Sequence, residues 1–194
     1  MEIGATKAVQ DRLKTTKIEE SKGASLVFCW DTHLTKIKGR NVLFIVNASN
    51  CYTIAMTDIE PRNWNYYAMY IIRVIHGMMQ EMGYSEEQIE QYFKMSGDTT
   101  ITKTHGRKSV GGINRMVMDA QYFGKKLEKE AKYQWELSEY LNRDICQPEG
   151  FDAYGYPNEL FKLDMERLGI ATKRKPAKVI DFAQYIENNR GTNH

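Results

Sequence analysis

The sequence predicts an α+β protein with a small, mainly antiparallel sheet, helices packed on one face, and a C-terminal helical tail. Four segments with strand character follow one another closely between residues 25 and 56. The chain after Pro61 instead repeats its apolar residues at helical spacing. Only short polar turns separate the strand segments, and this favours antiparallel pairing between sequence neighbours.

The strands are concentrated in the first third of the chain. Residues 2–5 are expected to form a short strand, and Thr6 then begins a helix that runs to about residue 14. Residues 25–30 and 33–37 are strand candidates, and the turn at Gly39 joins the second of them to residues 41–46 in a hairpin. Residues 42–46 are all apolar, which predicts a buried central strand. Residues 51–56 complete the group.

Helices account for most of the remaining chain. A long helix is expected over residues 62–82, and Gly83 ends it. Ser85 and Gln88 have the spacing of a capping box, so the next helix begins there and runs to about residue 95. A short strand over residues 99–104 and a helix from Ser109 to about residue 130 follow. Two more helices are expected over residues 133–142 and 158–168.

The chain is expected to form one domain with a tail. No long linker divides residues 1–170, which we predict to be a single α+β domain. Residues 171–194 are the tail. They contain a basic, proline-containing linker at residues 173–178 and an amphipathic helix at residues 179–188.

The composition of the chain limits which classes of protein it can belong to. The chain has 194 residues, of which 42% are hydrophobic and 27% charged, as in ordinary globular proteins. A net charge of +2 is too small to predict nucleic-acid binding. Cys29, Cys51 and Cys146 form no C-x-x-C motif, which favours a reducing compartment and gives no zinc motif. We therefore expect a cytoplasmic protein with no cofactor, no metal and no membrane association.

Residues 99–114, with the sequence TTITKTHGRKSVGGIN, are the candidate site. A strand with a threonine face leads into a cationic turn, and Ser109 is expected to be the N-cap of the helix that follows. Unpaired amides at a helix start, nearby cations and close-approach glycines together favour an anion. The candidate ligand-binding residues here are Thr102, Thr104, His105, Arg107, Lys108, Ser109, Gly111, Gly112 and Asn114.

Three residues outside this segment are expected to line the same site. Trp30 and His33 lie in the first strands, and Asn47 follows the central one. An aromatic ring beside cations and backbone amides suits a nucleotide-like molecule, because the ring stacks on a base while the donors hold phosphate. Packing of Trp30 in the core is the alternative interpretation.

Several short motifs resemble an uncharacterised bacterial family, known as domain of unknown function 6933. The residues that carry the resemblance are Ala5-Thr6-Lys7 with Asp11 and Leu13-Lys14, Phe28 with Trp30, His33-Leu34 and Ile37, Arg40-Asn41-Val42-Leu43, Val46-Asn47 with Tyr52, Thr102-Lys103-Thr104 with Arg107, Ser109, Gly112 and Asn114, and Tyr156-Pro157-Asn158-Glu159-Leu160. The resemblance covers about residues 1–168. Asp31-Thr32 separates Trp30 from His33 here, where the family has a Trp-His pair. The resemblance implies the architecture and a shared polar site, but no activity.

Three functional hypotheses follow from these residues. The first is non-catalytic binding, by sequestering or sensing, of a small anionic, nucleotide-like ligand. The second is an enzyme acting on a phosphate-containing or nucleic-acid substrate, with His33 and His105 as acid–base groups and Asp31 or Asp98 as orienting partners. The third is a protein-interaction or inhibitor module that docks, or forms a homo-oligomer, through the C-terminal helix. Nucleic acid is a less favoured partner of the basic linker.

Overall fold

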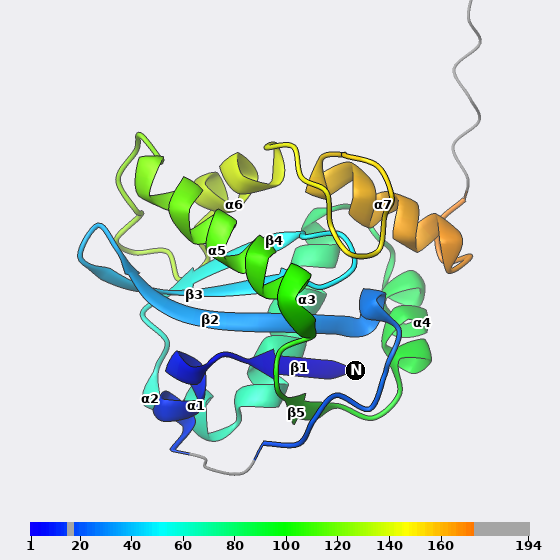
Figure 1. Cartoon of the computed structure of the whole chain (residues 1–194), viewed down its shortest axis with the longest axis horizontal. Helices are drawn as coiled ribbons and strands as arrows, with labels where there is room; N and C mark the ends of the chain where they lie inside the picture. The colour runs from blue at the N-terminus through cyan, green and yellow to red at the C-terminus, as the bar shows by residue number, and fades with distance from the viewer. Residues whose placement is uncertain (15–17, 173–194) are drawn as a thin grey trace, which may run out of the picture.

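The structure, a computed structural model, describes residues 1–14 and 18–172 (Figure 1). Five strands form one mixed sheet in the order β4-β3-β2-β1-β5. The strands are β1 (Glu2–Ala5), β2 (Cys29–Ile37), β3 (Arg40–Asn47), β4 (Thr53–Thr57) and β5 (Thr100–Thr102). The sheet and the helices around it confirm the α+β class.

The predicted meander forms one half of the sheet. β2 pairs antiparallel with β3, and β3 pairs antiparallel with β4, so sequence neighbours are also neighbours in space. The other half is parallel, because β1 lies between β2 and β5 and runs in the same direction as both. The two strand candidates at residues 25–30 and 33–37 are a short 3-10 helix, Leu26–Phe28, followed by the single long strand β2.

Helices cover both faces of the sheet, whereas we expected them on one face. The helices are α1 (Lys7–Leu13), α2 (Pro61–Asn65), α3 (Tyr67–Glu81), α4 (Glu86–Ser96), α5 (Gly106–Tyr122), α6 (Trp135–Asn142) and α7 (Pro157–Arg167). Figure 1 shows α5 in front of the sheet and α3 behind it.

The alternation of β3 explains the two-sided arrangement. Leu43 and Ile45 belong to one buried cluster, which includes side chains of α1, α2, α3, α4 and α7. Val42, Phe44 and Val46 point to the opposite face and pack with α5 and α6. A strand that is apolar at every position needs cover on both sides. The five-residue apolar run was therefore the signal for a two-sided sheet.

Three helix predictions are corrected by the structure. The expected helix over residues 62–82 breaks at Tyr66, where the backbone leaves helical geometry and Trp64 stacks on Tyr67 with centroids 5.5 Å apart. The helix expected to reach residue 130 ends at Tyr122, just before the buried side chain of Phe123. That helix begins at Gly106, so Ser109 is not its N-cap. The capping box of Ser85 and Gln88 is confirmed.

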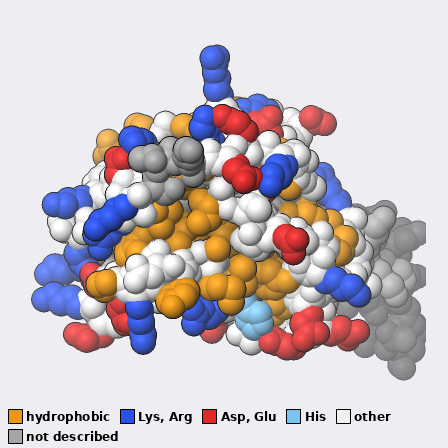
Figure 2. Space-filling model, turned by 90° about the horizontal axis from the view of Figure 1, so that it is seen from below, with side chains coloured by type: hydrophobic (Ala, Val, Ile, Leu, Met, Phe, Trp, Pro, Cys, Tyr) orange, Lys and Arg blue, Asp and Glu red, His pale blue; other side chains and the backbone are white. Residues whose placement is uncertain are grey.

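One face of the molecule carries exposed apolar side chains. In the view from below, hydrophobic side chains gather on the side where α1, α2 and β5 lie in Figure 1 (Figure 2). Tyr66 and Met69, at the start of α3, are exposed and line a hollow there. Within the described residues, none of the helices combines the length and the apolarity that crossing a membrane requires. The predicted tail helix at residues 179–188 lies outside the described residues.

Trp30 provides a test of the core. Its side chain is fully buried, and its indole N–H donates to the hydroxyl of Tyr92 over 2.9 Å. That hydroxyl in turn donates to the carbonyl of Val27 over 2.7 Å. We predict that Trp30→Phe lowers the free energy of unfolding by about 2 kcal/mol, because it removes a buried hydrogen bond and some packing. Urea unfolding measures this.

The matched control for that measurement is Trp135→Phe. Trp135 is 40% exposed, so the same change should alter stability by less than about 0.5 kcal/mol. Equal effects of the two substitutions would contradict the core placement of Trp30.

Candidate functional site

Strand alternation gathers polar side chains on the face of the sheet that α5 covers. Glu2 lies opposite Cys29 in the parallel pairing of β1 and β2, and Gly4 lies opposite Asp31. Because side chains alternate along a strand, Glu2, Cys29 and Asp31 share one face. These residues are buried, as is Ser109 in the first turns of α5.

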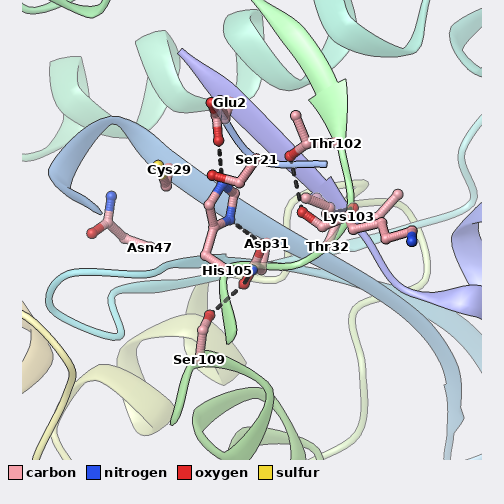
Figure 3. Close-up of polar contacts among 12 residues, drawn as sticks. Glu2, Ser21, Cys29, Asp31, Thr32, Asn47, Thr102, Lys103, His105 and Ser109 are labelled. Atoms are coloured by element: carbon pink, nitrogen blue, oxygen red, sulfur yellow. Dashed lines mark hydrogen bonds and ion pairs between the residues drawn. The ribbon is translucent and has the colours of Figure 1, made fainter. Parts of the chain in front are cut away.

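His105 lies at the centre of this group, which we call the His105 cluster: Glu2, Cys29, Asp31, His105 and Ser109 (Figure 3). Nδ1 of His105 lies 2.6 Å from Oδ1 of Asp31, and Nε2 lies 2.9 Å from Oε2 of Glu2. The His105 side chain is only 3% exposed. The Asp31 carboxylate also accepts from the hydroxyl of Ser109 and, over 3.1 Å, from the backbone N–H of His105.

The two carboxylates determine the protonation of the imidazole. A carboxylate only accepts hydrogen bonds, so both ring nitrogens of His105 must carry protons, which makes the ring cationic. Burial alone lowers the pKa of His105, but hydrogen bonds to Asp31 and Cys29 outweigh it and raise the pKa to about 10. Burial raises the pKa of Glu2, yet hydrogen bonds from Ser21, His105 and the Lys22 amide lower it overall.

Gly4 makes room for this arrangement. A Cβ atom built on Gly4 would lie 1.7 Å from Oδ1 of Asp31, which is far inside van der Waals contact. Asp31 is itself 0% exposed and cannot move into solvent. The absence of a side chain at Gly4 therefore allows Asp31 to reach His105.

The His105 cluster also contains the atoms of a possible metal-binding group. Among the described residues, Glu2, Cys29 and His105 each offer one donor atom, and the three atoms lie within 4.8 Å of one another. Cys29 also donates weakly to the carbonyls of Ala24 and Ser25. The imidazole proton occupies the space between His105 and Glu2, and hydrogen bonds already satisfy both residues. We interpret the group as a hydrogen-bonded cluster.

The anion expected at the start of α5 is supplied by the protein itself. Asp31 accepts from the N-cap amide of His105 and from the Ser109 hydroxyl, so its carboxylate lies where we expected a ligand phosphate. This corrects two predictions. Ser109 points inward to Asp31 and does not cap the helix, and His105 faces two buried carboxylates. The pairing of Asp31 with His105 that we considered for an enzyme is present, but it is buried.

Other predicted site residues have structural roles. Trp30 is fully buried, so it offers no stacking surface to a ligand. Asn47 is also fully buried, and its side chain donates to the Val27 carbonyl and accepts from the Ser49 amide. His33 is half-buried, where Nδ1 lies 3.1 Å from the Thr6 hydroxyl and burial lowers its pKa. These three residues do not meet at one site.

The remaining predicted residues divide between backbone turns and one surface pocket. Thr102 is buried, with its hydroxyl donating to the Lys103 carbonyl, and the Thr104 carbonyl accepts from Gly106. Asn114 is exposed farther along α5. The pocket has a volume of about 390 Å³ and contains four of the predicted residues. Its lining consists of Cys51, Arg107, Lys108, Gly111, Gly112, Arg115, Met116, Cys146 and Gln147. We call it the α5 pocket.

The α5 pocket is cationic. Arg107, Lys108 and Arg115 line it, and no carboxylate of the described residues does. Arg115 is paired with Asp144 over 2.7 Å. Arg107 and Lys108 are exposed and have no ion-pair partner among residues 1–14 and 18–172. They are consecutive residues at the start of α5. Because of the helical period, their side chains point away from the side on which Ser109 faces the sheet.

Sequence reasoning missed several of these residues. Cys51 and Cys146 are 95 positions apart, and nothing in the local pattern of either indicates the other. Arg115 lies two turns beyond Arg107 on the same helix, so helical spacing was a signal for it. Glu2 alternates with buried apolar residues in β1, and a carboxylate in such a short strand was a signal for a buried partner.

Comparison with known proteins identifies the family. A family described as domain of unknown function (DUF6933) matches residues 2–160, and the chain belongs to it. No curated protein and no solved structure gives a significant match.

The charge on His105 predicts how stability changes with pH. The pKa of His105 is raised from 6.5 to about 10 on folding. Between pH 6.5 and about 10, the imidazole therefore keeps its proton in the folded state and has lost it in the unfolded state. This stabilisation is complete below pH 6.5 and is lost as the pH rises through about 10. We predict that His105→Gln lowers the free energy of unfolding by about 3 kcal/mol below pH 6.5, with a smaller difference from wild type at higher pH.

Urea unfolding across this pH range tests the prediction, and His33→Gln is the control. Burial lowers the pKa of His33, so the contribution of this residue is lost as the pH falls. The stability difference between His33→Gln and wild type should therefore stay constant above pH 6.5 and change only at more acid pH. A His105→Gln effect that stays constant up to pH 10 would contradict a charged imidazole in the His105 cluster.

Proposed function

We propose that this member of a family of unknown function binds a small anionic ligand in the α5 pocket and does not transform it. The ligand class is a molecule with a phosphate or carboxylate group and a small apolar part. Such a protein would sequester or sense its ligand. The observation that carries the proposal is the pair of neighbouring cations, Arg107 and Lys108, on the pocket wall without a carboxylate partner in the described part of the chain.

Arg107 and Lys108 differ from Arg115, the third basic residue of the pocket, which is paired with a carboxylate. Arg115 is neutralised by Asp144, with a second carboxylate, that of Asp119, 3.5 Å away. Arg107 and Lys108 are left with their full charge beside the exposed backbone of Gly111. An arginine and a lysine together suit an oxyanion, because the guanidinium gives a planar fork and the ammonium a mobile charge.

The lining also limits the ligand. Met116 and the two cysteines give the inner wall an apolar character, so the ligand has an apolar part as well as a charged one. Within the part of the chain that the structure describes, no aromatic residue lines the α5 pocket, and Trp30 is buried elsewhere. Recognition of a nucleotide here would rest on phosphate and on the guanidinium planes, without a stacked aromatic ring.

The alternatives are less well supported. The His105 cluster has the groups for acid–base chemistry, but its imidazole is 3% exposed and lies between two carboxylates. His33 bonds Thr6 and does not face His105. Homo-oligomerisation or docking through the tail helix remains a proposal that concerns residues outside the described part. The three cysteines are free thiols, and we retain the proposal of a cytoplasmic location on that basis.

Titration calorimetry tests ligand binding. The panel contains inorganic phosphate, adenosine monophosphate, adenosine triphosphate and a dicarboxylate such as succinate. We predict heat for at least one compound, and an affinity at least about tenfold weaker in Arg107→Ala and in Lys108→Ala, because each change removes a charge-assisted contact. The double variant should give no measurable binding.

Lys126→Ala is the matched control. Lys126 is an exposed lysine beyond the end of α5, and it does not line the pocket. This variant removes the same unit of charge and should bind as the wild type does. Absence of heat for the whole panel, or equal losses in Lys126→Ala and Lys108→Ala, would overturn the proposal.

A further inference from the structure

The inner wall of the α5 pocket contains two cysteines that come from distant parts of the chain. Cys51 follows the turn after β3, and Cys146 lies in the loop after α6. Cys51 and Cys146 belong to the same buried cluster, and each thiol shifts the pKa of the other. Both side chains are largely buried, and both line the pocket, so the α5 pocket is a route for a small molecule to reach them.

The backbone fixes the position of both thiols. Cys146 pairs with Gly155 in a β-bridge, with N–H···O bonds of 2.9 and 2.8 Å in the two directions. Cys51 donates its N–H to the Asn47 carbonyl over 2.9 Å and has a φ of 61°, in the left-handed region that non-glycine residues rarely adopt. Gly112 of α5 packs on Cys51, since a Cβ at that position would lie 3.1 Å from its sulfur.

The surroundings distinguish the two sulfurs. Interaction with Cys51 lowers the pKa of the Cys146 thiol, and although burial opposes this, the charge of Arg115 acts in the same direction. The same interaction, together with burial, raises the pKa of Cys51. Cys146 is therefore the more readily ionised of the two thiols.

We propose that Cys146 and Cys51 form a dithiol site that exchanges with small disulfides entering the α5 pocket. The Cys146 thiolate attacks one sulfur of the small disulfide, whose S–S bond breaks, and the departing thiolate takes up a proton. Cys51 then loses its proton and attacks the Cys146 sulfur, which releases the second small thiol. The protein is oxidised by two electrons to a Cys51–Cys146 disulfide, and the small disulfide is reduced to two thiols.

Cys29 provides an internal comparison within the same molecule. It is equally free of disulfide bonds and fully buried, but it does not line the α5 pocket, and it donates to backbone carbonyls. The inference therefore predicts reaction at one pair of cysteines and protection of the third. It rests on the pocket that both cysteines line and on their place in one buried cluster, and it does not require that an anion binds there.

The experiment uses the reduced full chain and two reagents, the neutral bis(2-hydroxyethyl) disulfide and the anionic glutathione disulfide. Intact mass and peptide mapping follow the products. We predict that wild type loses two hydrogen atoms and links Cys51 to Cys146, with Cys146 reacting at least about tenfold faster than Cys29. Cys51→Ser should stop at a mixed disulfide on Cys146, and Cys29→Ser should react as wild type does.

Two results would overturn the inference. One is reaction of Cys29 as fast as that of Cys146 in the wild-type chain, a measurement that needs no variant to fold. The other is a folded Cys51→Ser variant, checked by circular dichroism, whose Cys146 stays unmodified. The neutral reagent separates this test from the proposed function. In the Arg107→Ala/Lys108→Ala variant, the neutral disulfide should react at the wild-type rate. Glutathione disulfide should react more slowly with this variant only if the α5 pocket attracts anions.

Discussion

The imidazolium of His105, held between the carboxylates of Glu2 and Asp31, joins three parts of the chain that are distant in sequence. Glu2 belongs to β1, Asp31 to β2, and His105 to the start of α5. Charges this deeply buried are costly unless they are paired and hydrogen-bonded. The pairing therefore fixes where α5 begins relative to the sheet, and the positions of the other side chains on α5 follow from it.

This constraint separates the two faces of α5. The inner face presents Ser109 to Asp31, and the positive end of the helix is neutralised by that carboxylate. The outer face presents Arg107 and Lys108 to the α5 pocket. A ligand at the pocket would consequently be held by side-chain cations, since the helix dipole is already satisfied from within. We expected the helix start and the cations to hold one anion together. Instead, the helix start binds the Asp31 carboxylate, and the cations line a separate surface pocket.

The sequence predicted the strands and the helix boundaries best where local chemistry determines them. The capping box at Ser85 and the run over residues 42–46 gave the right elements, because capping and alternation act between near neighbours. The parallel placement of β1 between β2 and β5 depends on contacts between distant segments, and no local pattern carries that information. The two-sided cover of the sheet was available from the apolar run, but the one-sided interpretation overlooked it.

The candidate site was predictable only in its local part. Arg107, Lys108, Gly111 and Gly112 are near neighbours and do line one pocket. The helical period sends His105 and Ser109 to the other side, and the expected N-cap at Ser109 lies four residues after the observed N-cap, His105, too late to show this. Trp30 illustrates the opposite limit. An indole in a strand has the same sequence pattern whether it is exposed to a ligand or packed on Phe161, and here it is packed.

The α5 pocket depends on the His105 cluster, but the His105 cluster does not depend on the α5 pocket. Changes in the His105 cluster would alter the start of α5 and so would move Arg107 and Lys108 as well as the sheet residues. Changes at Arg107 or Lys108 leave the cluster intact, because both side chains are exposed and have no described ion-pair partner. The backbone of Cys51 and of Cys146 is held by hydrogen bonds to residues outside α5, and Gly112 packs the helix against Cys51. Loss of binding in a cluster variant would thus reflect a displaced helix, whereas loss in a pocket variant with unchanged stability would reflect the ligand contact itself.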